Sequence, residues 1–291
     1  MAATRRNVRR MTGRMAGAGS RTAAELIPEK GLILSGYGIN SEMETQEALL
    51  RAGMASDIVH INDLIAGDRT LADYRLLVFP GGFSYGDDTG AGNAYANRIR
   101  NNLWDELLEF LDGDNLVLGI CNGFQILANL GLVPAFDKAH TRKIALMPNR
   151  SGRLECRFVT LKPANENLWT KGIERISCPV AHGEGNFSCA KETLAEIRRR
   201  KMIAFTYCRE DLSPAGGEYP WNPNGSIEDI AGITSANGRV LGLMPHPERA
   251  MDPVNLYDWP LLREQARREG RPLPAESPNM QIFRNIAAYF S

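Results

Sequence analysis

Short apolar runs alternate along the chain with longer segments whose apolar residues recur at helical spacing. The runs at 31–35, 57–61, 75–79 and 116–120 are typical of buried strands. Between them, segment 93–111 places Ile99, Leu103, Leu107 and Phe110 at the spacing of an amphipathic helix. Such alternation predicts an α/β domain built on a doubly wound parallel sheet.

Further elements follow from local signals. Ser41 and Glu44 form a capping-box pattern for a helix that runs to about Ala52, with Met43 and Leu50 on one face. The second half is richer in strands, with Asn237-Gly238 as a hairpin signal. We expect strands at 151–160, 176–180 and 202–206, a strand pair over 227–244, and a final amphipathic helix at 280–289 after a Pro-rich connector.

The stretch 115–125 (NLVLGICNGFQ) carries the main chemical signal. A buried strand leads through Gly119 and Gly123 into a helix start, with Cys121 between them. This is a nucleophile elbow with cysteine in the serine position, and the helix N-terminus there favours a thiolate. A buried cysteine can simply pack as a small hydrophobe, but the flanking glycines favour a catalytic role.

A glycine-rich stretch, 80–88 (PGGFSYGDD), follows the third expected strand. Adjacent glycines allow backbone N–H groups to face a ligand at the carboxyl edge of a sheet. Taken alone, the stretch is better explained as a turn, and Asp87 and Asp88 as a solvated loop or helix cap.

A later strand, 240–244, delivers His246 and Glu248. Side chains two residues apart in an extended segment point the same way, so Glu248 can orient the imidazole of His246. Beside a cysteine elbow this pair is better explained as a base with its orienting carboxylate than as a surface turn.

The segment 181–187 (AHGEGNF) is expected to be a polar loop near the active site. His182 and Glu184 within it invite a metal site, but no further ligands are closely spaced, so we predict no metal.

Composition excludes several classes. The 291 residues carry 34 basic and 34 acidic side chains, which gives no reason to expect nucleic acid or an anionic membrane as partner. The five cysteines form no C-x-x-C pair, which argues against a zinc ribbon or a disulfide framework and suits a reducing cytosol. No apolar run is long enough to span a membrane.

The first 28 residues differ in character from the rest. They are rich in arginine, and their first acidic residue is Glu25. A disordered extension is the simpler explanation, and a transit peptide the alternative. We therefore predict a basic extension at 1–28 and one catalytic domain at 29–291.

With these motifs in place, the chain resembles the class I (triad) glutamine amidotransferases, over about residues 31–250. Within that class it is most similar to the glutaminase subunits of phosphoribosylformylglycinamidine synthase, in purine biosynthesis. The resemblance is carried by PGGFSYGDD, LGICNGFQIL, PVAHGEGNF, NPNGS and GLMPHPER, in that order. It implies a flavodoxin-like doubly wound parallel sheet with added β-rich segments.

The resemblance also implies roles for individual residues. The triad would consist of the nucleophile Cys121, the base His246 and the orienting Glu248. The remaining roles are an oxyanion hole from Gly82 and Asn122, and glutamine contacts from Gln125, Gly183 and Glu184.

The same resemblance implies partners. The chain has no phosphate-binding loop motif, so no cofactor is expected on it. ATP and magnesium are expected on a PurL-type synthase subunit that receives ammonia, with a PurS-type small third subunit as a further candidate. A cytoplasmic enzyme is implied.

Two other classes remain open. One is a different cysteine hydrolase on the same elbow, acting on γ-glutamyl substrates. The other is a catalytically silent binding subunit, which would usually have lost Cys121 or His246, and both are present.

Overall fold

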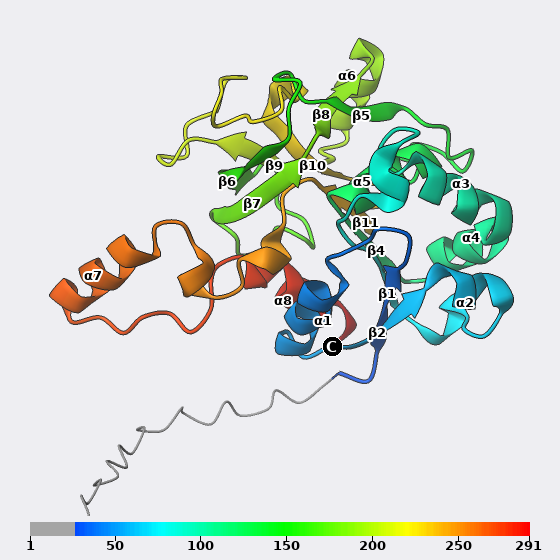
Figure 1. Cartoon of the computed structure of the whole chain (residues 1–291), viewed down its shortest axis with the longest axis horizontal. Helices are drawn as coiled ribbons and strands as arrows, with labels where there is room; N and C mark the ends of the chain where they lie inside the picture. Colours follow the sequence, from blue (N-terminus) through cyan, green and yellow to red (C-terminus); the bar gives the residue numbers. More distant parts are fainter. Residues whose placement is uncertain (1–26) are drawn as a thin grey trace, which may run out of the picture.

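The centre of the molecule is a nine-stranded mixed sheet with the order β2-β1-β3-β4-β11-β10-β9-β6-β7 (Figure 1). The computed structural model describes residues 27–291. The first five strands in this order are mutually parallel, as the strand and helix alternation predicts. They are β2 (Ala55–His60), β1 (Lys30–Ser35), β3 (Leu76–Phe79), β4 (Leu116–Ile120) and β11 (Val240–Leu243).

The rest of the sheet is antiparallel and accounts for the β-rich second half of the sequence. The hairpin predicted at Asn237-Gly238 joins the last parallel strand to the first antiparallel one. These strands are β10 (Ile230–Thr234), β9 (Ile203–Cys208), β6 (Glu155–Pro163) and β7 (Ile176–His182), and a separate pair is formed by β5 (Ile144–Pro148) and β8 (Glu184–Cys189).

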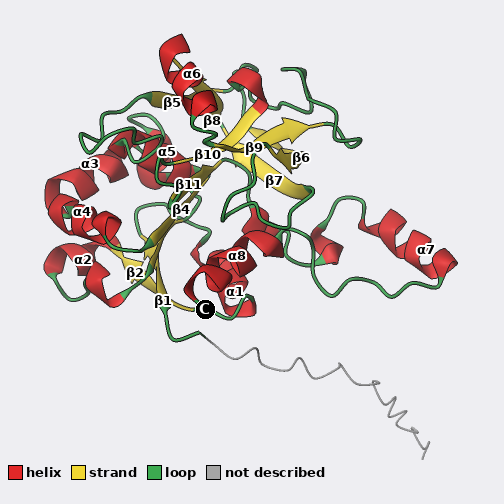
Figure 2. Cartoon of the chain, turned by 180° about the vertical axis from the view of Figure 1, so that it is seen from behind, coloured by secondary structure: helices red, strands yellow, loops and turns green. Residues whose placement is uncertain are grey.

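Helices cover both faces of the parallel half. Seen from behind, α2, α3 and α4 lie on one side of its strands, and α1 and α8 lie together on the other (Figure 2). None of the helices within residues 27–291 is long and apolar enough to cross a membrane. The helices are α1 (Glu42–Arg51), α2 (Ile61–Ala66), α3 (Asn93–Asn102), α4 (Trp104–Asp112), α5 (Asn122–Leu130), α6 (Lys191–Arg199), α7 (Trp259–Glu269) and α8 (Met280–Phe290).

Two predictions for the first half are wrong in detail. The single helix expected over 93–111 is two helices, α3 and α4, because the backbone at Leu103 leaves helical geometry. Helix α1 exists, but the side chain of its N-cap, Ser41, makes no capping bond, and Met43 and Leu50 are exposed. The buried face of α1 consists of Thr45, Ala48 and Leu49.

Two further predictions fail in the second half. The loop expected at 181–187 is a tight turn at Gly183 between β7 and β8. The Pro-rich connector before the last helix contains α7, which projects from the body as an arm (Figure 1). The predicted basic extension lies outside the described residues, apart from residues 27 and 28.

The sheet brings distant parts of the sequence to one edge. Strands β3, β4 and β11 are adjacent and parallel, so their carboxyl ends lie side by side. These ends lead directly into the glycine-rich stretch 80–88, the elbow at Cys121 and the segment 245–249. The fold therefore gathers the three strongest sequence motifs at one place.

Candidate active site

Cys121 sits on a strained turn between β4 and α5. Its φ of 51° and ψ of −106° lie in a region that non-glycine residues rarely adopt. The flanking glycines make the turn possible, since a Cβ on Gly123 would lie 1.8 Å from the carbonyl oxygen of Phe79, and one on Gly119 would lie 2.5 Å from Leu127. The elbow predicted from the sequence is therefore present in backbone geometry.

His246 and Glu248 form a buried pair beside this elbow. The imidazole Nδ1 lies 2.6 Å from Oε1 of Glu248, and both side chains are almost fully buried. The pairing was expected, but its backbone is a 3₁₀ turn (η4, Pro247–Arg249) and not an extended segment. Gly81 is needed beside the ring, because a Cβ there would lie 2.4 Å from His246 Cε1.

The charge state of His246 is set by opposing effects. Burial alone would lower the pKa of His246, but the negative charges of Glu248 and the Cys121 thiolate outweigh it and raise this pKa to about 9. Within the described residues, Nε2 has no partner at ordinary hydrogen-bond geometry. At neutral pH His246 is therefore an imidazolium and has a proton to donate.

Gly82 and Asn122, the residues expected to form the oxyanion hole, lie at the ends of neighbouring strands. The stretch 80–83 bridges to Ile39 through the N–H groups of Asn40 and Phe83, which leaves the N–H of Gly82 out of the bridge. Asn122 is the first residue of α5, so its N–H has no acceptor within the helix. A Cβ on Gly82 would lie 2.5 Å from the carbonyl oxygen of Gly38, so only glycine fits.

The side chain of Asn122 ties the elbow to the glycine-rich stretch. It accepts from the N–H of Ser84 (3.3 Å) and donates to Asp87 Oδ1 (3.3 Å) and Gln125 Oε1 (2.8 Å). Asp87, expected to be solvated or a cap, is half-buried. Its burial and the charge of Glu184 raise its pKa to about 6.

The residues expected to contact glutamine lie on the other side of the elbow. Gln125 is buried, and its amide donates to the backbone carbonyl of Glu184. The Glu184 carboxylate accepts from the N–H of Ala91 (3.1 Å). Gly183 forms the turn between β7 and β8 next to it, so the structure brings Gln125, Gly183 and Glu184 together.

Sequence reasoning missed the polar side chains that hold this turn. Asn149 Oδ1 accepts from Gly185 N–H, and Ser226 Oγ accepts from the N–H of Phe187. The Ser226 hydroxyl donates to Asn224 Oδ1 (2.7 Å), and the carbonyl of Gly185 lies farther away, at 3.3 Å. Both supports lie in loops distant in sequence, and the Asn-Pro-Asn-Gly-Ser motif ending at Ser226 was the available signal for one of them.

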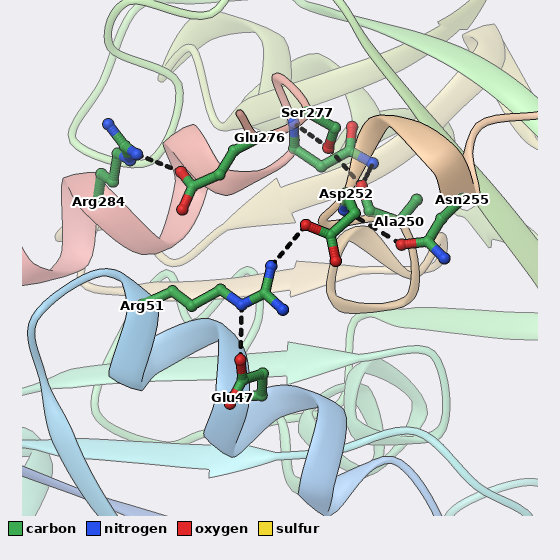
Figure 3. A network of polar contacts seen from close by, with 9 residues as sticks. Glu47, Arg51, Ala250, Asp252, Asn255, Glu276, Ser277 and Arg284 are labelled. Carbon is green, nitrogen blue, oxygen red and sulfur yellow. Dashed lines mark hydrogen bonds and ion pairs between the residues drawn. The ribbon is translucent and has the colours of Figure 1, made fainter. Parts of the chain in front are cut away.

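A polar network at the base of the α7 arm joins the chain after η4 to α1 and to the segment before α8 (Figure 3). Arg51 of α1 donates to Asp252 (2.8 Å) and Glu47 (2.6 Å). Ser277 donates its hydroxyl to the carbonyl of Ala250, which also accepts from Asn279 (2.9 Å). The two ends of the arm are thereby pinned directly after Glu248.

The part of the chain from residue 27 onward contains no group of three His, Cys, Asp or Glu side chains that could hold a metal ion. What the site offers is a thiol nucleophile, a charged imidazole with a buried carboxylate, and two backbone N–H groups. This set can attack a carbonyl carbon, hold the resulting oxyanion and protonate a leaving amine.

Comparison with known proteins points to the same chemistry. A family model described as the CobB/CobQ-like glutamine amidotransferase domain matches residues 29–290. The chain is 52% identical over 268 residues to the phosphoribosylformylglycinamidine synthase subunit PurQ of Methanococcus maripaludis, covering 90% of this chain and 97% of that one. It is 36% identical to the phosphoribosylformylglycinamidine synthase of Drosophila melanogaster, covering 89% of this chain but 19% of that protein.

Solved structures agree on the fold. The chain superposes on a chain of the PurLQS structure from Thermotoga maritima with a TM-score of 0.67 and 28% identity, covering 90% of this chain and 99% of that one. A glutamine amidotransferase from the same organism matches with a TM-score of 0.51 and 16% identity over 90% of this chain and 97% of its own, a likeness of fold alone.

Proposed function

The chain belongs to the CobB/CobQ-like glutamine amidotransferase family, and from this premise we propose that it is the glutaminase subunit of a phosphoribosylformylglycinamidine synthase. It hydrolyses glutamine to glutamate and ammonia and passes the ammonia to a PurL-type synthase subunit in purine biosynthesis. The observation that carries this proposal is the buried His246–Glu248 pair at a cysteine elbow, in a chain 52% identical to a PurQ subunit.

The first half of the reaction forms a thioester. The Cys121 thiolate attacks the side-chain amide carbon of glutamine, and the oxyanion accepts from the N–H groups of Gly82 and Asn122. One such donor is typically worth about 3 kcal/mol in the transition state. His246 then protonates the leaving nitrogen, so the carbon–nitrogen bond breaks and ammonia departs.

The second half releases glutamate. The imidazole of His246, now neutral, takes a proton from a water molecule that attacks the γ-glutamyl thioester. The carbon–sulfur bond breaks and the thiolate returns. Glu248 keeps the ring oriented and stabilises its charged form in both halves, while Gln125, Gly183 and Glu184 hold the amino acid end of glutamine.

ATP and magnesium belong to the synthase partner in this proposal, and the complex works in the cytoplasm. A PurS-type third subunit is a further partner, by analogy with the PurLQS structure. The domain that carries the activity spans residues 29–291.

The test is glutamate release by purified protein. Cys121→Ala is expected to abolish it, and the circular dichroism spectrum and melting temperature should stay close to those of the unmodified protein. Full activity in a folded Cys121→Ala protein would contradict the proposal. Preference for γ-glutamyl peptides over glutamine would favour the alternative hydrolase.

A further inference from the structure

His182, the last residue of β7, is a buried histidine that the reaction above does not use. Its side chain is 1% exposed. The backbone at Gly185 lies against its ring, since a Cβ there would be 2.4 Å from His182 Cε1. A side chain at position 185 is therefore excluded by the ring of His182.

The hydrogen bonds around Asn149 fix the tautomer of His182. Asn149 Nδ2 donates to the carbonyls of Arg153 (2.8 Å) and His182 (2.7 Å), which defines the orientation of the amide. Its oxygen therefore faces Gly185 N–H and the ring Nδ1 of His182, each at 3.1 Å. An amide oxygen can only accept, so Nδ1 carries the proton and Nε2 presents a lone pair.

That lone pair has no hydrogen-bond donor in the described part of the chain. Within residues 27–291, Nε2 of His182 is buried and has no hydrogen-bond partner. A buried acceptor without a donor costs free energy, and native proteins usually place a small polar molecule at such a point. Nε2 can therefore accept from a small donor that is not part of the chain.

The face of β7 that bears His182 is buried, and the strand lies beside the site. Cys178, Val180 and His182 follow one another at every second position, so they share one face of the strand, and all three are buried. The strand also touches the site through its backbone, because the N–H of His246 donates to the carbonyl of Pro179 (2.9 Å) and the carbonyl of Ala181 lies 3.9 Å from Cys121 Sγ.

The electrostatics of this face agree with the packing. Burial, followed by the charge of Glu248, raises the pKa of Cys178. Burial, followed by the charge of His246, lowers the pKa of His182 to about 3. His182 is thus a neutral acceptor throughout the physiological pH range, close to the group that protonates the leaving nitrogen.

We propose that Nε2 of His182 accepts a hydrogen bond from the ammonia released at Cys121 and is its first binding point on the way to the synthase. The inference rests on the proposed function. No proton moves in this step, because His246 has already supplied the one that ammonia needs. Ammonia is a stronger base than imidazole, so an ordinary charged histidine would protonate it and trap it as ammonium, whereas neutral His182 cannot.

The decisive variant is His182→Asn, in the complex with the PurL-type synthase. Its amide nitrogen can replace Nδ1 as donor to Asn149, but nothing replaces Nε2. We expect the amidated product formed per glutamate released to fall about three- to tenfold, the range for one lost neutral hydrogen bond. With ammonium chloride in place of glutamine, product formation should be unchanged.

Ser226→Ala is the matched control. It removes a hydroxyl that accepts from the N–H of Phe187, in the strand after the same turn, and has no contact with Nε2. Its product-to-glutamate ratio should stay near that of the unmodified complex. An unchanged ratio in His182→Asn, or an equal fall in both variants, would show that His182 only supports the turn and would overturn the proposal.

A second measurement covers the case in which His182→Asn does not fold. Nitrogen-15 NMR of the Cys121→Ala protein should show His182 with a protonated Nδ1 and an unprotonated Nε2 down to pH 5. Addition of ammonium chloride at pH 9 should shift the Nε2 resonance. A protonated Nε2, or an Nε2 resonance that does not respond to ammonium chloride, would overturn the proposal. If the unmodified protein released no glutamate from glutamine, that result would count against the proposed function alone.

Discussion

At the scale of single residues, the buried carboxylate of Glu248 helps to keep His246, the acid of the proposed reaction, in its charged form. Its charge and that of Cys121 raise the pKa of His246 to about 9 against the opposing effect of burial. The stabilisation from this raised pKa is complete below the ordinary value of about 6.5 and is lost as the pH rises through 9. The imidazolium should therefore persist over the neutral range and disappear at alkaline pH.

Glu248→Gln should move the alkaline limit of activity. A neutral amide still accepts from the ring but no longer supports its charge, so the pKa of His246 should fall and kcat/KM should decline at a lower pH than in the unmodified enzyme. At pH 7.5 the variant should lose less than His246→Ala, which removes a proton donor typically worth about 10² to 10⁴ in rate. Glutamate release measured from pH 6 to 10 checks the shift of the alkaline decline and the comparison with His246→Ala. If the alkaline decline of kcat/KM in Glu248→Gln began at the same pH as in the unmodified enzyme, Glu248 would act only through packing.

Asp87 offers a second test of charge at this site. Burial and Glu184 raise its pKa from 3.8 to about 6, so the charged form is disfavoured in the folded protein. Stability should therefore fall as the pH rises through this interval. In Asp87→Asn that loss is absent, so the melting temperature of the variant minus that of the unmodified protein should be more positive at pH 7.5 than at pH 4.5.

The control for this comparison is Asp68→Asn, which removes one exposed carboxylate away from the site. It reports the general effect of one lost charge. If the difference in melting temperature between Asp87→Asn and the unmodified protein were the same at both pH values, the surroundings would not disfavour the charged form of Asp87.

At the scale of elements, the sequence predicted the strands and helices whose spacing of apolar residues reflects their own buried faces. The placement of Cys121, His246 and Glu248 near one another could be predicted because they lie in short motifs that follow the adjacent parallel strands β4 and β11. Their catalytic roles stay a prediction. The break at Leu103 could not be predicted by periodicity. Leu103 is itself buried, so apolar spacing continues across the kink between α3 and α4.

Two other misses have opposite causes. The glycines of 181–187 suggested a loop, but Gly185 is required by close packing against His182 within a strand. Helix α7 has one buried residue, Ala266, so it offers no apolar stripe, although Pro260 near its start and Gly270 at its end are helix-boundary signals. Distant polar supports such as Asn149 have no local signal, because their partners come from tertiary structure.

The base of the arm, between α1 and η5 (Pro253–Asn255), follows His246 and Glu248 in the chain and can be tested separately (Figure 3). Arg51 is mostly buried and donates to Asp252 and Glu47. Arg51→Gln should lower the free energy of unfolding by about 1 kcal/mol, because it removes a charge-assisted hydrogen bond that solvent partly screens. Urea unfolding measures this, with Glu264→Gln as control, since its ion pairs with Arg267 and Arg268 are exposed and should contribute less.

A double-mutant cycle with Asp252→Asn separates the pair from its surroundings. A coupling energy near zero between positions 51 and 252 would mean that the arm is held by its other contacts. A positive coupling accompanied by lower kcat, with KM for glutamine unchanged, would place this anchor in the positioning of His246.

At the scale of the whole molecule, the two halves of the mixed sheet contribute different parts of the site. The parallel half carries the elbow and the His246–Glu248 pair at its carboxyl edge, and the antiparallel half brings β7 and the turn at Gly183 across from them. Motif order predicted the parallel half and its function. Apart from the hairpin of β10 and β11, the antiparallel half was predicted only as extra strands, because the pairing of β6, β7 and β9 depends on contacts that no local pattern records.

The three residues proposed as the triad are buried, whereas the neighbouring stretch 82–88 is partly exposed. Cys121, His246 and Glu248 are each at most 2% exposed, whereas the stretch 82–88 includes the exposed Phe83 and left-handed residues Tyr85 and Asp87. A partner that contacts this surface can therefore change the oxyanion hole without touching the triad. Ammonia released without a partner would be lost as ammonium in neutral water, so a dependence of activity on the partner would limit this loss.

We therefore expect weak glutamate release from the isolated chain and a rise when the PurL-type synthase, its formylglycinamide ribonucleotide substrate and ATP are added. A coupling of ordinary size would raise kcat/KM for glutamine by about 5- to 150-fold. Steady-state glutamate release with each component omitted in turn measures the effect, and Cys121→Ala in the same complex is the blank. An isolated chain that is already fully active and does not respond to the synthase would indicate a free-standing hydrolase, because its oxyanion hole would then need no partner to form.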